Sequence, residues 1–148
     1  MIMQYTPANF VKYFVGMLSI AVGVVLMKRS ALGMSSWDTL HNSIDHLSDF
    51  ITLGMATIFV AMIFTIAVIV LNKHIKYLIM AIPIFFVGLL IDLFDLVIFV
   101  DFEATTIFIQ IISYTAGLLM LPLGGALLLS STFPAGVFDE FMLVVARK

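Results

Sequence analysis

The sequence has no cysteine and few charged side chains. Charged residues make up 11% of its 148 residues, whereas a soluble domain carries about 25%. So few charges cannot cover a water-facing surface, and lipid must therefore surround most of the chain. The lack of cysteine excludes disulfides and cysteine-based zinc or iron sites. A net charge of −2 without a basic cluster argues against nucleic acid as a partner.

Four apolar stretches are each long enough to cross about 30 Å of hydrocarbon, which takes roughly 20 helical residues. The loops between them are short, so neighbouring spans are expected to form antiparallel hairpins within one domain, residues 1–148. The segments Ser35–Asp49 and Gly136–Lys148 do not span. We therefore predict an all-α, polytopic transmembrane helix bundle with two additional short polar or re-entrant helices. The predicted spans are Phe10–Met27, Phe50–Leu71, Tyr77–Phe99 and Thr105–Leu129.

The basic residues predict the orientation of the chain in the membrane. With a cytoplasmic N-terminus, five basic residues lie inside and two lie outside. We therefore expect the N-terminus to be cytoplasmic, although the two outer residues do not fit the rule. The inner residues are Lys12, Lys73, Lys76, Arg147 and Lys148, and the outer ones are Lys28 and Arg29.

A gapless self-match appears when the sequence is shifted by 101 residues, with six identities in the 23 positions from Gly16 to Asp38. The match begins in the first span and again in the fourth, so the units cover about residues 10–100 and 104–148. Because one unit holds an odd number of spans, the second must be inverted in the membrane, as in many secondary transporters. A chance match between glycine-rich spans is the alternative. The identical pairs are Gly16/Gly117, Leu18/Leu119, Gly23/Gly124, Leu26/Leu127, Ser30/Ser131 and Asp38/Asp139, and Trp37 is aligned with Phe138.

The second unit is incomplete, because it lacks two spans. We expect either that the chain is a fragment of a longer protein or that a partner chain completes the fold. A homo-oligomer or a partner membrane protein is thus considered alongside the lipid bilayer.

A short motif follows the first span, where Leu32-Gly33 precedes Trp37 and Asp38. It resembles the Leu-Gly-x-x-Pro-Trp-Asp-type motif of the YczE/YyaS/YitT family of bacterial membrane proteins. Ser36 stands where that family usually has proline. The resemblance implies a multi-pass protein of the bacterial inner membrane, often supposed to be a transporter, without identifying a substrate.

Two further patterns resemble that family. Gly88-x-x-x-Asp92 is similar to its third-span pattern. In the second copy of the first motif, Asp139 fits, whereas Val137 and Glu140 replace the expected proline and glycine. These departures leave open whether the second half keeps the same geometry.

Two aspartates, Asp92 and Asp95, lie inside the third predicted span. An aspartate near the centre of a spanning helix costs roughly 2.5–3.5 kcal/mol, so its carboxyl group must face protein or water. Gly88, Asp92 and Asp95 share one helical stripe. Asp92 is closer to the centre and is the stronger candidate for binding a proton or a cation, while Asp95 is shallower. A buried, hydrogen-bonded aspartate without a transport role is the alternative for both.

Asp38 and Asp139 each lie three residues after a potential helix cap, Ser35 and Gly136. A carboxylate at this position stabilises the positive end of a helix, which is a complete structural explanation. The alternative is that two re-entrant helices, one from each side, point their N-termini at an anion or a polar substrate.

The segment Ser35–Asp49 is amphipathic, and its polar stripe contains Asp38, His41 and Asp45. Carboxylate and imidazole groups could bind a metal, but we expect a solvated polar face on the membrane surface. We expect no metal and no cofactor. Trp37 is interpreted as an anchor at the membrane interface.

Small residues on the first and fourth spans predict close packing between them, because helices approach closely in lipid only through small side chains. We expect the two spans to pack about a pseudo-two-fold axis. The residues are Gly16, Ser19 and Gly23 on the first span, and Ser113, Gly117 and Gly124 on the fourth.

No nucleophile–base pair and no phosphate-binding loop is present, so we do not expect an enzyme. The main hypothesis is a transporter-like protein for a small solute of unknown identity. The alternative is a non-catalytic membrane protein that assembles with, or regulates, another membrane protein.

Overall fold

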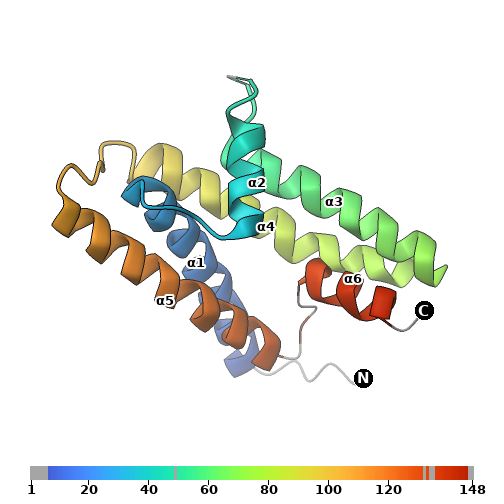
Figure 1. Ribbon diagram of the computed structural model, residues 1–148. Coiled ribbons are helices and arrows are strands. Elements are labelled where there is room, and N and C mark those ends of the chain that lie inside the picture. Colours follow the sequence, from blue (N-terminus) through green and yellow to red (C-terminus); the bar gives the residue numbers. More distant parts are fainter. Residues whose placement is uncertain (1–6, 49, 132, 134–135, 147–148) are drawn as a thin grey trace.

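The computed structural model describes residues 7–48, 50–131, 133 and 136–146. This part of the chain is helical and contains no strand, and Figure 1 shows how the helices are arranged. The elements are α1 (Pro7–Ser30), α2 (Ser36–Asp45), α3 (Leu53–Asn72), the 3-10 helix η1 (Ile75–Met80), α4 (Ala81–Leu93), the π-helical turn η2 (Phe94–Ile98), α5 (Ile107–Ser130) and α6 (Val137–Ala146).

Within the described residues, four segments are long and apolar enough to cross a membrane, with mean hydropathies from 1.8 to 2.6. The third is continuous from Tyr77 to Ile98 and combines η1, α4 and η2. The prediction of a polytopic helical membrane protein is confirmed. Each observed span lies within a few residues of its predicted bounds, because an unbroken apolar run has little choice but to form a helix in lipid.

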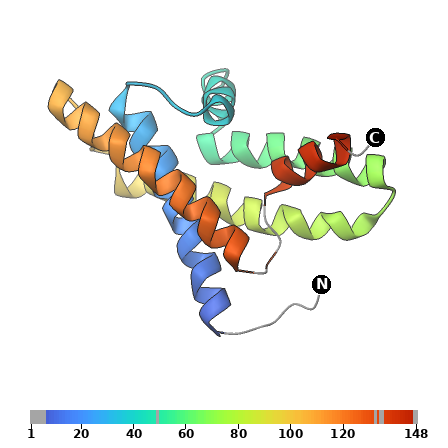
Figure 2. The same ribbon diagram turned by 60° about the horizontal axis from the view of Figure 1, so that its bottom comes forward.

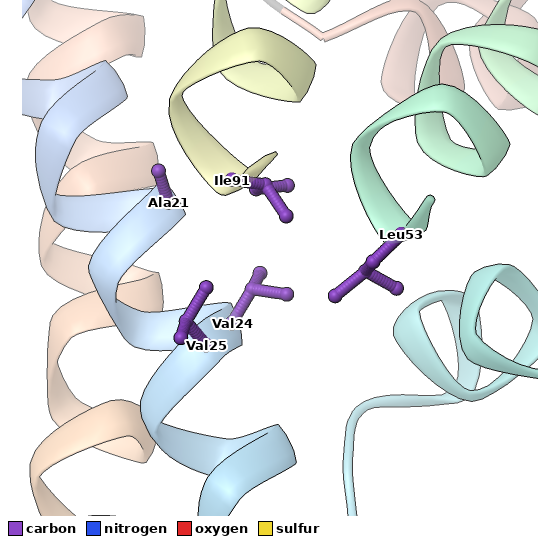
Figure 3. Packing of buried hydrophobic residues seen from close by; sticks show 5 residues of the cluster. All are labelled: Ala21, Val24, Val25, Leu53 and Ile91. Carbon is purple, nitrogen blue, oxygen red and sulfur yellow. The ribbon is translucent and has the colours of Figure 1, made fainter. Parts of the chain in front are cut away.

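Helix α1 lies between two other spans. It packs against α5 on one side and against α4 on the other. Figure 3 shows its side chains Ala21, Val24 and Val25 facing Ile91 of α4 and Leu53 of α3. All five are at most 2% exposed, so α1 joins the α5 side of the molecule to the α3–α4 pair.

The α1–α5 contact is antiparallel and depends on glycines. A Cβ atom added at Gly16 would lie 2.9 Å from the carbonyl oxygen of Gly124, and one added at Gly117 would lie 2.6 Å from that of Gly23. Between these two glycine contacts, the Ser19 hydroxyl donates a hydrogen bond to the carbonyl oxygen of Met120 at 2.8 Å. The two backbones are therefore in direct contact, and larger side chains would separate them.

Helix α2 does not span the membrane and starts close to the middle of α3. The Trp37 ring, in the first turn of α2, meets the edge of Phe64, with ring centroids 5.2 Å apart. Phe64 is eleven residues past Leu53, about 16 Å along a helix that rises 1.5 Å per residue. The C-terminal end of α2 returns to the end of α1, where Asp45 contacts Lys28. Figure 1 shows the loop that leads from the end of α1 to the start of α2, which packs beside α3.

Helix α6 approaches the same level of α3. Val137, its first residue, is buried with Ala61 and Val68, and Phe138 contacts both Trp37 and Phe64. Figures 1 and 2 both show α6 lying alongside α3 and extending toward the end of α3 that precedes η1. The N-terminal turns of α2 and α6 therefore meet near the middle of α3, and the two helices extend in different directions from this point.

Candidate functional site

The first turn of α2 carries its own cap. Ser35 is the N-cap residue, and its hydroxyl oxygen accepts a hydrogen bond from the Asp38 backbone N–H at 3.3 Å. The same hydroxyl donates to Oδ2 of Asp38 at 2.5 Å. This confirms the cap predicted from Ser35 and Asp38. Asp38 is 9% exposed, so a buried carboxyl group lies at the positive end of α2.

His41 lies one turn further along α2 and is 2% exposed. Its Nδ1 is 3.3 Å from the Thr57 hydroxyl oxygen on α3, and its ring centroid is 6.4 Å from that of Phe138 on α6. Nδ1 is 3.9 Å from Oδ1 of Asp38, which is beyond hydrogen-bond distance. The other ring nitrogen, Nε2, is buried and has no hydrogen-bond partner within the described part of the chain. A polar group left unpaired in this way is costly.

Aromatic rings fill the place where α2 and α6 meet. Trp37 stacks on Phe138 with centroids 4.6 Å apart and an interplanar angle of 22°, and Phe64 contacts Phe138 and Phe141 edge to face. We expected Trp37 to anchor a helix on the membrane surface. The structure places its ring against Phe64 of α3 and Phe138 of α6, and the role at the membrane interface stays a prediction.

Asp139 belongs to the first turn of α6, but its side chain lies outside the described residues. The segment starts with Gly136, and its first helical residue is Val137. The structure therefore brings the backbone of Asp139 close to the α2 terminus, through its neighbour Phe138.

A group of ion pairs joins α1, α2 and η2 at the end of α1. Lys28 Nζ is 2.8 Å from Oδ2 of Asp45 on α2 and 2.8 Å from Oδ2 of Asp95 in η2. Arg29 Nε donates to Oδ1 of Asp95 at 2.9 Å. The polar stripe considered as a possible metal site does not come together, because Asp45 pairs with Lys28 and not with Asp38 and His41. No group of three metal-ligating side chains occurs in the described part of the chain.

Arg29 also reaches the backbone at the end of the third span. It donates to the carbonyl oxygens of Asp95 at 2.6 Å and Val100 at 3.3 Å. Asp95, in the π-helical turn Phe94–Ile98, contacts α1, while Asp92 of α4 contacts the start of α3. The two aspartates therefore do not share one environment, contrary to the stripe expected from their spacing. Lys28 and Arg29, which did not fit the orientation rule, are both paired with acids.

Asp92 binds the N-terminus of α3. Its carboxylate accepts a hydrogen bond from the Thr52 hydroxyl at 2.6 Å and from the Gly54 backbone N–H at 2.8 Å. Gly54 and Gly88 are in backbone contact at this crossing. The structural alternative for Asp92, a hydrogen-bonded carboxylate, thus has full support from the geometry, and the predicted ion-binding role stays a prediction.

Sequence reasoning identified Asp38, Asp92 and Asp95 but missed the cations that pair with Asp95. The sequence contained a signal for this pairing. Lys28 and Arg29 end the first span at the outer side of the membrane, and Asp95 was predicted near the outer end of the third span. The glycines predicted for helix packing, Gly16, Gly23, Gly117 and Gly124, lie together at the α1–α5 crossing. Ser19 also lies there, and Ser113 is buried on α5.

A family model matches residues 8–148 of the chain. The chain belongs to the DUF6198 family, described as a family of unknown function. No curated protein and no solved structure matches the chain. These comparisons provide no evidence for the narrower assignment to the YczE/YyaS/YitT family.

Proposed function

We propose that this membrane protein is transporter-like and passes a small polar solute along a path between α2 and α6. The observation that carries the proposal is the meeting of two short helices by their N-terminal turns near the middle of a membrane span. Helix N-termini present unpaired N–H groups and a positive end of the helix dipole. Half-helices of this kind form solute and ion sites near the midplane of secondary transporters.

The proposal includes an inverted repeat that relates α1–α2 to α5–α6. Two helices related by a two-fold axis make reciprocal contacts. If the mate of a residue is its equivalent in the other repeat, then a contact between residue i and the mate of residue j comes with a contact between j and the mate of i. With a shift of 101 residues, Gly16 is the mate of Gly117 and Gly23 is the mate of Gly124. The contacts in fact join Gly16 to Gly124 and Gly23 to Gly117, which supports this arrangement.

Residues on such an axis meet their own mates, and two pairs do so. Ser19 donates its hydrogen bond to Met120, which lies 101 residues later. Trp37 stacks on Phe138, again 101 residues later. The first pair lies at the α1–α5 crossing and the second at the meeting point of α2 and α6. Both pairs support a common axis through these two contacts.

The two serines that end the repeated spans have matching environments. Ser30 and Ser131 are each fully buried and donate to the carbonyl oxygen three residues earlier at 2.6 Å. Each also accepts from the backbone N–H two residues later, at 3.3 and 3.4 Å. Local geometry this similar supports a repeat over a chance match of glycine-rich spans.

Cysteine labelling tests the proposed path, because the chain has no cysteine of its own. A cysteine at exposed Ser36, in the first turn of α2, should react with a charged thiol reagent that enters only from water. A matched cysteine at Ile63, which is 51% exposed on the face of α3, should stay unreactive because lipid covers it. Equal protection at both positions would mean that no water path reaches α2.

The same approach tests the inverted arrangement. Cysteines at exposed Ser43, near the end of α2, and at exposed Ala146, at the end of α6, should be labelled from opposite sides of sealed vesicles. Labelling of both from one side would exclude it. Osmotic swelling of proteoliposomes in urea and in glycerol then measures whether a small polar solute passes.

A second candidate function is assembly with, or regulation of, another membrane protein. It is favoured by a cavity of about 310 Å³ between α3 and the third span, lined only by apolar side chains. Without a hydrophobic effect between helices in lipid, such a hollow is filled best by a complementary helix surface. A stoichiometric partner chain, together with no labelling of Ser36→Cys, would favour this function. The lining includes Ala61, Met62, Ala81, Ile82, Phe85 and Phe86.

A further inference from the structure

The hydrogen-bond network around His41 favours hydrogen on one of its two ring nitrogens. The Thr57 hydroxyl donates to the carbonyl oxygen of Leu53 at 2.9 Å. While its hydrogen is used in this bond, the Thr57 oxygen accepts from His41, and Nδ1 of His41, at 3.3 Å, is the donor.

The second ring nitrogen is then an acceptor without a donor. An imidazolium this buried, with no described carboxylate within hydrogen-bond distance, would be far more costly than the neutral ring. In the neutral ring with hydrogen on Nδ1, Nε2 carries a lone pair. Nε2 is buried and lacks a partner among the residues that the structure describes, although His41 lies among polar groups of α2 and α3 and next to Phe138 of α6.

We propose that Nε2 of His41 is a binding position for a hydrogen-bond donor inside the protein, supplied by the O–H or N–H group of a water molecule or of a small polar solute. A donor at this point would remove the cost of the unpaired acceptor. The site lies one turn from the α2 terminus, beside the proposed path. The solute source rests on the proposed function, whereas the water source does not.

Nitrogen-15 NMR of histidine-labelled protein in lipid nanodiscs reads this position directly. Loss of one signal in His41→Gln identifies the residue, and exposed His46 on the same segment gives a matched control through His46→Gln. We expect hydrogen on Nδ1, and an Nε2 signal shifted upfield from that of a free acceptor. If His41→Gln fails to fold, the unaltered protein still shows three histidine environments.

The two sources of the donor give different results. Magnetisation transfer from water to His41 that does not change with added urea or glycerol identifies water as the occupant. A shift of Nε2 that titrates with urea or glycerol identifies a solute donor. Hydrogen on Nε2, or an Nε2 signal that responds to neither water nor solute, would overturn the inference. Swelling assays on the same preparation report the proposed function separately, because an impermeable protein can still bind water at Nε2.

A second variant tests the tautomer argument. Thr57→Val removes the acceptor for Nδ1, so the ring should move toward the form with hydrogen on Nε2. Thr65→Val is the matched control, because Thr65 is also buried on α3 and donates to a carbonyl four residues earlier at 2.8 Å. The control should leave the His41 signals unchanged. An equal change in both variants would indicate a general effect on α3 and contradict the assignment.

Discussion

The helix pairs α1–α2 and α5–α6 share their packing but differ in their chemistry. Both long helices use glycines at the α1–α5 crossing, and both end in a buried serine with the same hydrogen bonds. At the end of α1, however, Lys28 and Arg29 pair with acids. The positions 101 residues later are Leu129 and Ser130. Backbone contact is thus what the two pairs have in common, while within the described part of the chain the ion pairs occur in the first pair alone.

The difference in chemistry between the two helix pairs also includes His41. The residue 101 positions after it is Met142, and the one after Asp45 is Ala146. Within the described side chains, polar groups collect on α2 and apolar ones on α6. A solute that passes between these helices would meet hydrogen-bonding groups mainly from α2.

The largest expected effect comes from the ion pairs at the end of α1, which have no counterpart among the described side chains of α5 and α6. Asp95→Asn would leave Lys28 and Arg29 without their shared, 3% exposed carboxylate. We expect a loss of about 3 kcal/mol, because removing one partner of a buried ion pair leaves an uncompensated charge. Reversible unfolding in mixed detergent micelles measures it. Exposed Asp101→Asn is the control and should change little, so equal effects would contradict a specific role for Asp95.

The shared glycine packing is expected to be the next most sensitive feature. Gly117→Val would force a side chain against the Gly23 carbonyl oxygen and Met27, at a cost of about 2 kcal/mol from overpacking. Gly125→Val is the matched control on the same helix, since nothing lies within 4 Å of the added Cβ. Thermal unfolding of both variants checks the difference. If both lost the same stability, helix propensity rather than packing would explain the loss.

The smallest expected effect tests whether the ends of α1 and α5 are equivalent. Ser30→Ala and Ser131→Ala each remove a buried hydroxyl with two hydrogen bonds. We expect equal losses of about 0.6 kcal/mol, the average size of side-chain hydrogen bonds within membranes. The same micelle titration measures both. A clear difference between them would mean that the two helix ends are not equivalent.

Much of the fold could be predicted, because lipid leaves an apolar run of about 20 residues only one low-energy structure. The cap at Ser35 was also predictable, since it joins residues three positions apart. The packing of α2 against α3 and α6 was not, because these partners are far away in the sequence. The contacts of Trp37 with Phe64 and Phe138 were not expected for that reason.

The candidate site was predictable only in its individual residues. Asp92 and Asp95 were correctly singled out as acids inside a span, but their partners Thr52, Gly54, Lys28 and Arg29 are far away in sequence. The π-helical turn Phe94–Ile98, which contains Asp95, was not predicted either. His41 was noted only as part of a polar stripe, since its burial depends on α3 and α6.

The sequence alone determined that the chain is helical and crosses a membrane, because the free energy of transferring apolar residues and unpaired backbone groups is local and additive. Which acid pairs with which cation, and which ring nitrogen of His41 is left without a partner, was decided only in the tertiary structure. Such pairings depend on distances of a few ångströms between helices that the linear order does not bring together.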